Sequence, residues 1–227
     1  NNLLSTQSSL LHIYDLLLAA YGQQHWWPAS SPFEVIVGAI LTQSAAWVNV
    51  EKTIDNLKQA GALTPAVLRD VSADKLAELL YSCGYYNAKA KKLKAFVQHL
   101  FDDYNDNLDT MFNQDTEDLR TELLTIHGVG DETADSIILY AAKKPVFVVD
   151  AYTRRIFSRL GFDKADQKYG NLQALFVKNL IGESRLFNEY HALLVYHGKK
   201  VCKKIPLCHK CCIEVLCEYT SDKQAKA

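Results

Sequence analysis

The chain has 227 residues, of which 48% are hydrophobic and 22% are charged, and its formal net charge is −1. These values are typical of an ordinary globular protein that buries a core without disulfide staples. They argue against a membrane-spanning protein, because no apolar run approaches the roughly 18 to 20 residues that a span needs. The N-terminus also lacks the basic-then-apolar plan of a signal peptide, so we expect a cytoplasmic protein.

Apolar residues recur at three- and four-residue spacing along almost the whole chain, which predicts an all-α protein. In chain order, we expect helices over residues 6–21, 32–43, 47–60, 73–82, 87–104, 116–126, 131–142, 150–160, 170–180 and 184–199. A further short helix is expected to start at Thr64-Pro65, and Ser31-Pro32 is a typical helix start. KPVFVVD (144–150) is the one β-branched stretch, and we expect it to run extended between two helices.

Charge is unevenly distributed along the chain. Residues 1–142 hold 9 basic and 18 acidic side chains, whereas residues 143–227 hold 16 and 8. A locally basic surface can bind a polyanion even when the net charge is close to zero. A basic segment that only confers solubility explains the same counts, and charge alone favours that alternative.

The segment IHGVGDETAD (126–135) joins two predicted helices by a very tight turn. Gly128 and Gly130 permit backbone conformations closed to other residues and leave the amide N–H groups unshielded. Amides at a helix N-terminus attract an anion such as a DNA phosphate. The negative charges of Asp131 and Glu132 in the first helical turn are stabilised by the helix dipole even when no ligand is bound. A plain hairpin whose glycines serve packing is the alternative interpretation.

The longer string HGVGDETAD-x-I-x-L followed by VVDAYTRRIFSRLG resembles the helix-hairpin-helix motif and following aspartate of the endonuclease III superfamily of DNA glycosylases. FEVIVGAILTQSAAWVNV (33–50) and GYYNAKAKKL (84–93) resemble its early helix pair and its Gly-x-Tyr-Asn-x-Lys-Ala segment. This resemblance implies damaged double-stranded DNA as the partner and Asp150 as the catalytic residue. The implied DNA-contacting residues of the hairpin are Gly128, Val129, Gly130 and Thr133.

The same resemblance implies a two-domain fold and a monomer. A six-helix barrel over residues 30–140 would end in the hairpin. Residues 1–29 and 141–227 would form a second helical domain that carries a four-cysteine loop. DNA would lie across the cleft between the domains, held mainly by salt-dependent phosphate contacts.

Asp150 has a chemical and a structural interpretation. Breaking an N-glycosidic bond builds positive charge on the deoxyribose, and a fixed carboxylate can stabilise that charge and orient the attacking water. Asp150 also suits the N-cap of the helix AYTRRIFSRL, and both roles can hold at once.

Glu132 departs from the pattern of the bifunctional members of the superfamily. Those members carry a lysine at the second position after Gly-x-Gly, and its amine forms a Schiff base with the sugar. A carboxylate cannot form that imine, so we predict a monofunctional glycosylase that uses water and leaves an abasic site. Two interpretations of Glu132 stay open: a general base in catalysis, or a residue whose charge interacts favourably with the helix dipole and has no catalytic role.

Five of the six cysteines lie between residues 202 and 217. The spacing C-x5-C-x2-C-x5-C closely resembles the C-terminal iron-sulfur loop of endonuclease III, with a departure of one residue in the first gap. Four thiolates suit a 4Fe-4S cluster and would also bind zinc. Cys212 is an extra thiol that could compete as a ligand, and we expect the metal to be structural. The predicted metal ligands are Cys202, Cys208, Cys211 and Cys217.

The three tryptophans flank the two early helices, and they either serve ordinary packing or form a base pocket. HWWP (25–28), the aromatic after TQSAA and the late HGK (197–199) resemble the bacterial 3-methyladenine DNA glycosylase III subfamily, whose members lack the cysteine loop. This implies alkylated purines as substrates, which are cationic in DNA and attracted to an indole face. Trp27 and Trp47 would then sandwich the flipped base, with Trp26 and Pro28 lining the pocket.

Gln43 resembles the residue that fills the gap left by an extruded base, although a solvated side chain is the simpler interpretation. The basic residues of the GYYNAKAKKLK segment either line DNA or form a solvated face; they are Lys89, Lys91, Lys92 and Lys94. Two other functions stay open: a glycosylase for deaminated, oxidised or mismatched bases, and a non-catalytic iron-sulfur protein that binds DNA.

Overall fold

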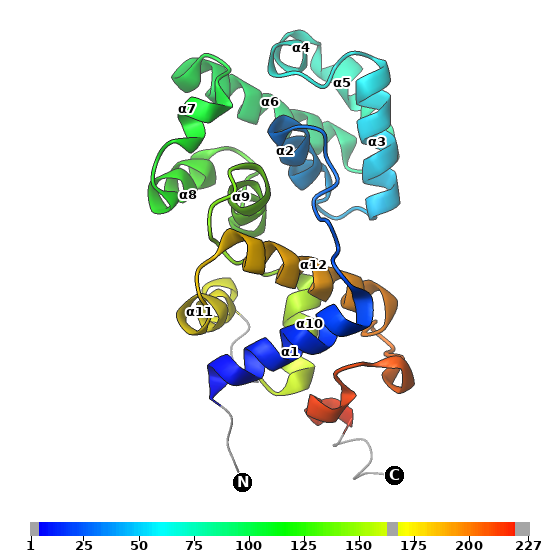
Figure 1. The fold of residues 1–227 in the computed structure, drawn as a ribbon. Coiled ribbons are helices and arrows are strands. Elements are labelled where there is room, and N and C mark those ends of the chain that lie inside the picture. Colours follow the sequence, from blue (N-terminus) through cyan, green and yellow to red (C-terminus); the bar gives the residue numbers. More distant parts are fainter. Residues whose placement is uncertain (1–4, 163–167, 221–227) are drawn as a thin grey trace. The chain divides into compact units, whose positions relative to one another are not determined.

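The computed structural model describes residues 5–162 and 168–220, and these residues form helices and turns without a strand. The predicted all-α class is therefore confirmed, and no described helix is long and apolar enough to cross a membrane. The helices are α1 (Thr6–Tyr21), α2 (Pro32–Leu41), α3 (Trp47–Gln59), α4 (Pro65–Asp70), α5 (Ala73–Leu79), α6 (Tyr86–Tyr104), α7 (Leu108–Phe112), α8 (Thr116–Thr125), α9 (Asp131–Ser136), α10 (Ala151–Leu160), α11 (Tyr169–Asn179) and α12 (Ser184–Lys200) (Figure 1). Shorter helical turns are η1 (Tyr81–Cys83), η2 (Ile137–Ala141), η3 (Cys208–Lys210) and η4 (Glu214–Leu216).

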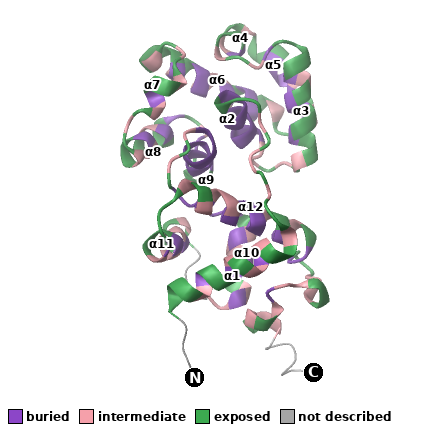
Figure 2. Ribbon diagram, viewed as in Figure 1, coloured by how far each residue is buried: buried purple, intermediate pink, exposed green. Residues whose placement is uncertain are grey.

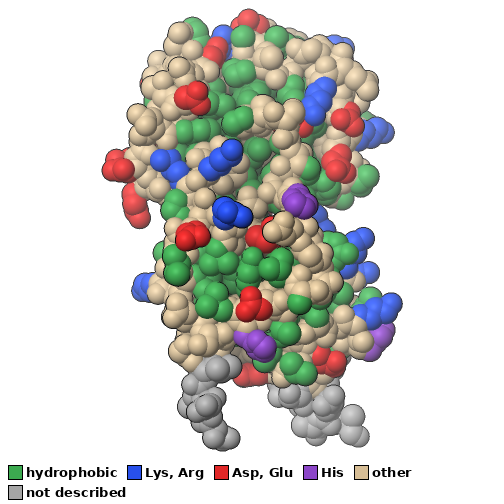
Figure 3. Space-filling view, viewed as in Figure 1, with side chains coloured by type: hydrophobic (Ala, Val, Ile, Leu, Met, Phe, Trp, Pro, Cys, Tyr) green, Lys and Arg blue, Asp and Glu red, His purple; other side chains and the backbone are tan. Residues whose placement is uncertain are grey.

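The described residues divide into two compact units. The hairpin unit comprises residues 27–144 and contains α2 to α9 with η1 and η2. The cysteine unit comprises the residues up to Trp26 and those from Pro145 onward, and it contains α1 and α10 to α12. On the face drawn in Figure 3, Lys and Arg side chains lie among acidic ones.

Helix α2 forms the centre of the hairpin unit. It begins as predicted, with the Ser31 hydroxyl accepting a hydrogen bond from the Glu34 amide and Pro32 at the first helical position. Every residue from Phe33 to Leu41 is buried (Figure 2). The helix is apolar on most of its surface, and its one buried charge, Glu34, is paired with the Lys58 ammonium at 2.7 Å. Such a helix is stable only when it is surrounded, and α2 packs against α3, α6, α9 and η2.

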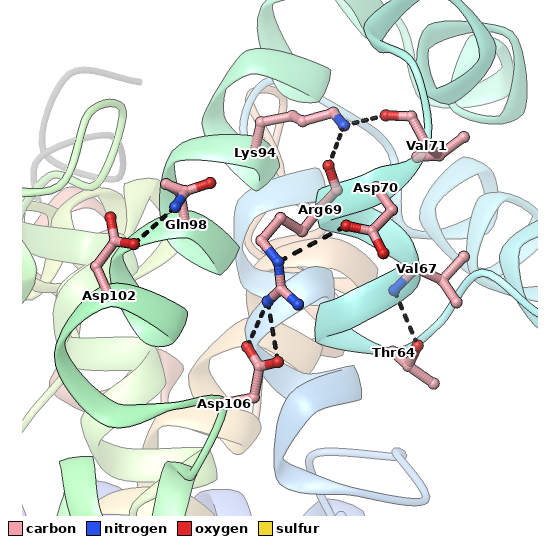
Figure 4. A network of polar contacts seen from close by, with 9 residues as sticks. All are labelled: Thr64, Val67, Arg69, Asp70, Val71, Lys94, Gln98, Asp102 and Asp106. Atoms are coloured by element: carbon pink, nitrogen blue, oxygen red, sulfur yellow. Dashed lines mark hydrogen bonds and ion pairs between the residues drawn. The ribbon is translucent and has the colours of Figure 1, made fainter.

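A polar network ties α4 to the end of α6 (Figure 4). The Arg69 guanidinium donates to both carboxylate oxygens of Asp106 at 2.7 and 2.9 Å and lies 4.1 Å from the centroid of the Phe101 ring. The Lys94 ammonium donates to the backbone carbonyls of Arg69 and Val71. These bonds satisfy carbonyls at the end of α4 that have no partner within the helix.

Aromatic side chains form the core of the cysteine unit. Phe147 stacks on Phe176 with ring centroids 3.7 Å apart, and Phe176 contacts Phe157 edge-on at 4.7 Å. Buried Tyr190 packs against the same rings and donates its hydroxyl to the Leu10 carbonyl at 2.8 Å. Phe147 lies in the segment between η2 and α10, which has neither helix nor strand, as expected for KPVFVVD.

Two parts of the helical prediction differ from the structure. Helix α7 was not predicted, because five residues are too few to show an apolar period. The helix predicted over 131–142 changes at Ile137 into the π-helical turn η2, which widens the helix by one residue per turn. The apolar run IILYA has no polar positions that would reveal this change in the sequence.

Candidate active site

The two glycines of the hairpin have different structural roles. Gly128 has φ +83°, and a Cβ atom there would lie 2.2 Å from Cγ of Lys92, whose side chain lies along the turn. Gly130 has φ −101° and is the N-cap of α9, and a Cβ atom there would meet no atom within 4 Å. Gly128 is therefore required by the backbone and its packing, whereas Gly130 keeps the start of α9 open.

The Gln43 side chain is bound to this hairpin. Its amide nitrogen donates to the Gly128 carbonyl at 2.9 Å and to the Thr133 hydroxyl at 2.9 Å. Its amide oxygen accepts a hydrogen bond from the Lys92 ammonium. Gln43 is thus a brace between the end of α2 and the hairpin, and filling a gap in DNA would require these bonds to break.

An ion-pair network holds α8 against α9. The Arg120 guanidinium donates to Asp135 at 2.7 Å and to Asp131 at 2.6 Å. The Asp135 side chain is fully buried. Asp131 therefore has a local partner in addition to the helix dipole, while Glu132 is exposed at the start of α9.

The basic residues of α6 do not share one solvated face. Lys89 is buried, its ammonium donates to the Cys83 carbonyl at 2.8 Å, and burial lowers the pKa of Lys89 below its ordinary value. Lys92 and Lys94 donate to protein oxygens as described above, and of the four lysines Lys91 is the exposed one. Lys89 therefore fits neither a solvated face nor a DNA-lining role.

Trp27 is the centre of an aromatic group in the hairpin unit. Its ring contacts Trp47 at 5.3 Å with an interplanar angle of 79° and Tyr140 at 5.4 Å with an angle of 61°. It also lies against Gly38, where a Cβ atom would be 3.0 Å from the indole Cζ2. The two indoles meet edge to face and form no parallel slot, so sandwiching a base would require one ring to turn.

The structure also gives the surroundings of the other two predicted pocket residues. Pro28 is exposed. Trp26 belongs to the cysteine unit, where the Lys199 ammonium lies 5.8 Å from its ring centroid. The contact of Tyr140 with Trp27 was not predicted, because no motif in the sequence connects this residue of η2 with the tryptophans.

Asp150 is the N-cap of α10 and is buried. One carboxylate oxygen accepts hydrogen bonds from the Thr153 amide at 2.7 Å and hydroxyl at 2.9 Å, and the other lies 3.6 Å from Nε2 of His191. Burial by itself would raise the pKa of Asp150, but the His191 and Thr153 contacts outweigh it and hold the pKa below the ordinary 3.8. The carboxylate is therefore ionised at neutral pH, and His191 is a partner that sequence analysis missed.

The cysteine loop rests on the C-terminal ends of α10 and α12. The Arg159 guanidinium donates to Sγ of Cys202 at 3.2 Å, and Sγ of Cys217 donates to the Arg159 carbonyl at 3.4 Å. Sγ of Cys211 lies 3.7 Å from Nε2 of His197, and the Cys211 amide donates to the Cys208 carbonyl in the C-x2-C turn.

A four-thiolate metal site is compatible with this arrangement. The four predicted cysteines lie on one short loop, and sulfurs from three of them contact just two anchoring residues. Over the residues that the structure describes, no group of three or more ligating side chains is already gathered in metal-binding geometry. The donor chemistry fits an iron-sulfur cluster or zinc, and the loop would have to close around either.

An all-helical fold with a glycine turn before α9 and a buried aspartate at the start of α10 fits the helix-hairpin-helix DNA-repair enzymes that the sequence resembles. The profile of the HhH-GPD superfamily base excision DNA repair proteins matches residues 37–180. The chain belongs to this family and is a DNA glycosylase of base excision repair that binds DNA.

Individual relatives agree with this assignment. A Methanocaldococcus jannaschii protein named as a candidate DNA repair glycosylase is 49% identical over 207 residues, which cover 90% of this chain and 94% of that protein. Endonuclease III of Sulfolobus acidocaldarius is 31% identical over 192 residues, or 84% of this chain and 83% of that protein. A solved structure of H. pylori 3-methyladenine DNA glycosylase bound to 1,N6-ethenoadenine has a TM-score of 0.74 and 29% identity, and the match covers 87% of this chain and 98% of that one.

Proposed function

We propose that this protein is a monofunctional glycosylase that flips alkylated purines such as 3-methyladenine out of duplex DNA and removes them by hydrolysis, leaving an abasic site. The observation that carries the proposal is the pair Asp150 and Glu132. Asp150 is an ionised, buried carboxylate, and Glu132 occupies the position of the nucleophilic lysine in bifunctional members.

Asp150 would act by electrostatic stabilisation. As the base departs, positive charge builds on the deoxyribose, and a fixed anion close to that charge lowers the barrier. Thr153 and His191 hold the carboxylate in one orientation and keep it charged, so no proton has to be removed before the reaction begins. The same carboxylate orients the attacking water.

The hairpin would hold the DNA backbone. The first amides of α9 have no acceptors within the helix, and the N-cap Gly130 has no side chain to satisfy them. A phosphate oxygen is a suitable acceptor at such a helix start. The brace formed by Gln43, Thr133 and Lys92 would keep Gly128 in the conformation that presents these amides.

The substrate class is supported by the aromatic group around Trp27 and by the similarity to the H. pylori 3-methyladenine glycosylase. Alkylated purines are cationic in DNA, and indole faces attract cations. Their glycosidic bond is already weak, so a carboxylate without a strong general acid suffices. In this proposal Trp27 and Trp47 hold the base, and one of the rings turns to admit it.

The proposed cofactor is a 4Fe-4S cluster held by the four spaced thiolates of the cysteine loop. When bound, the cluster would supply structural cross-linking of the loop through its thiolate bonds. Zinc is the alternative metal for the same ligand set. Lys203 and Lys204, whose carbonyls accept from Arg159, lie on this loop and are exposed to solvent.

A bifunctional enzyme is the second candidate, because endonuclease III is among the relatives above 30% identity. The two candidates differ in one chemical product. A bifunctional enzyme forms a Schiff base that borohydride traps as a covalent protein-DNA adduct, whereas a monofunctional enzyme forms none.

The test is release of free base from duplex DNA treated with a methylating agent, with Asp150→Asn assayed in parallel. We expect wild type to release 3-methyladenine, the variant to release little above background, and the strands to stay intact until alkali is added. Release from uracil, hypoxanthine or 8-oxoguanine duplexes instead would refute the substrate class. Cleavage without alkali, or a borohydride adduct, would refute the monofunctional mechanism. No release from any of these substrates would favour a non-catalytic DNA-binding protein.

A further inference from the structure

The segment that carries Trp27 is tied to the start of α2 by a buried glutamate. The Glu34 side chain is 4% exposed, and one of its carboxylate oxygens accepts hydrogen bonds from the Ser30 amide at 3.0 Å and from the Ser30 hydroxyl. The other oxygen lies 2.7 Å from the Lys58 ammonium of α3. One carboxylate therefore joins three parts of the hairpin unit: the segment before α2, α2 itself and α3.

These contacts go beyond what the start of a helix requires. Ser31 is the N-cap of α2, and its hydroxyl accepts from the Glu34 amide at 3.2 Å. In an ordinary capping box, the glutamate side chain returns to the amide of the N-cap residue. Here the carboxylate binds both the amide and the hydroxyl of Ser30, the residue before the N-cap. It therefore holds the incoming segment as well as the end of the helix.

The Trp27 indole is held from two sides. Its backbone lies three residues before Ser30, and the stretch between them is closed by a hydrogen bond from the Ala29 amide to the Trp27 carbonyl at 3.0 Å. The indole itself lies against Gly38 of α2, where a Cβ atom would be 3.0 Å from Cζ2 and 3.3 Å from Nε1. The ring thus rests on a helix surface that has no side chain at the point of contact, and its backbone is anchored beside it.

The charge of Glu34 strengthens this anchor. Burial by itself would raise the pKa of Glu34, but the contacts with Lys58 and Ser30 outweigh it and hold the pKa below the ordinary 4.5. Hydrogen bonds to an ionised acceptor are roughly twice as strong as those between neutral groups. The carboxylate therefore binds Ser30 more firmly than the neutral amide of a glutamine would.

We propose that Glu34 is a positioning residue of the base pocket, and that it holds the Trp27 indole against α2 through Ser30. This inference rests on the proposed function, in which Trp27 contacts the target base. Glu34 acts on the base only through the indole, so its loss should slow base removal and leave the phosphate contacts that hold the DNA unchanged. A displaced pocket wall lowers the rate because the base is no longer held in its reactive orientation.

The first test is spectroscopic and needs no DNA. The chain has three tryptophans, so Trp26→Phe combined with Trp47→Phe leaves Trp27 as the single emitter. We expect Glu34→Ala in this background to shift the emission to longer wavelength and to increase its quenching by acrylamide. Glu78→Ala is the matched control, because its carboxylate also pairs with a lysine at 2.8 Å, but on the exposed surface of the same unit. Emission and quenching in Glu34→Ala that equal those of the control would overturn the proposal.

The second test measures base release in single turnover at saturating enzyme, with DNA affinity measured on the same samples. We expect Glu34→Ala to lower the rate about tenfold and to leave DNA affinity unchanged. Glu34→Gln, which keeps the shape and loses the charge, should lower the rate about threefold. Ser30 is exposed, so Ser30→Ala should stay folded, and it should also lower the rate about threefold. Folded variants that all react at the rate of wild type would show that Glu34 serves stability alone.

A double-mutant cycle separates positioning from a general structural effect. If Glu34 acts through the indole, Glu34→Ala should cause no further loss of rate once Trp27→Ala has removed the ring. A full additional loss in the double variant would refute the proposal.

Failure of the proposed function has its own outcome. If wild type releases a base other than 3-methyladenine, the substrate class is wrong, and the same cycle on the released base still decides the role of Glu34. A wild type that releases no base refutes the role in the pocket, whereas the emission of Trp27 still reports whether Glu34 holds the ring.

Discussion

Replacing Gly128 by alanine should damage the hairpin through two separable effects. Alanine at φ +83° costs roughly 1 to 2 kcal/mol, because Cβ crowds the following carbonyl. The new Cβ would also lie 2.2 Å from Cγ and 2.5 Å from Cδ of Lys92, so the whole side chain must move. Moving it breaks the bond from Lys92 to Gln43, which is worth about 1 kcal/mol.

The expected total for Gly128→Ala is therefore a loss of about 2 to 3 kcal/mol in the free energy of unfolding. The assay is urea denaturation followed by tryptophan fluorescence, with DNA affinity measured on the same samples. Lys92→Ala in combination with Gly128→Ala removes the clash, so the penalty of the glycine change should fall to its backbone part of about 1 to 2 kcal/mol.

Gly130→Ala is the control within the same turn. Its φ of −101° suits alanine, and no atom lies within 4 Å of the new Cβ, so we expect a loss of only about 0.5 kcal/mol at this N-cap. Its effect should appear in DNA affinity, because the methyl group narrows the approach to the first amides of α9. If Gly130→Ala destabilised the protein more than Gly128→Ala, the division of roles between the two glycines would be refuted.

Three further predictions concern single side chains. The pKa of Asp150 is depressed, so the stability that its charge contributes is complete above the ordinary value of 3.8 and is lost as the pH falls below that value. His191→Leu should raise the pKa of Asp150 and move the acid limb of the pH profile of base release to higher pH. An acid limb that does not move would argue against the contact between His191 and Asp150. Arg120→Met should lower the free energy of unfolding by about 3 kcal/mol, because it leaves the charge of Asp135 in a buried site without its partner Arg120. Urea denaturation of this variant and of Arg120→Lys tests the prediction, and a loss below about 1 kcal/mol in Arg120→Met would contradict it. Glu132→Lys should produce a borohydride-trapped adduct with damaged DNA that wild type does not form, and an adduct with wild type would contradict our interpretation of this position.

Local signals in the sequence predicted most of the helices and their starts. Ser31 and Pro32 start α2 as expected, and Asp150 is the N-cap of α10, as the structural interpretation of this residue predicted. Such features depend on a few neighbouring residues, whose periodicity and capping chemistry are visible without any tertiary contact. The five-residue helix α7 and the π-helical turn η2 escaped, because neither leaves a local period.

For the candidate site too, the sequence predicted some features and missed others. The glycine turn and the spaced cysteines were found from residue type and short spacing, and the roles of Asp150 and Glu132 came from the resemblance of the surrounding motif to a known family. The partners that orient these residues were not found, because they approach from distant parts of the chain. Tyr21 meets His197 across 176 positions, and Gln43 meets Gly128 across 85.

What the sequence by itself determined was therefore the inventory of reactive groups and the helices that carry them. What only the tertiary structure decided was which nitrogen or oxygen each group faces. The physical reason is that hydrogen bonds act over about 3 Å, whereas the positions of their partners follow from the packing of whole helices. Burial of Lys89, the edge-on contact of Trp27 with Tyr140 and the contact of Tyr21 with His197 all depend on that packing.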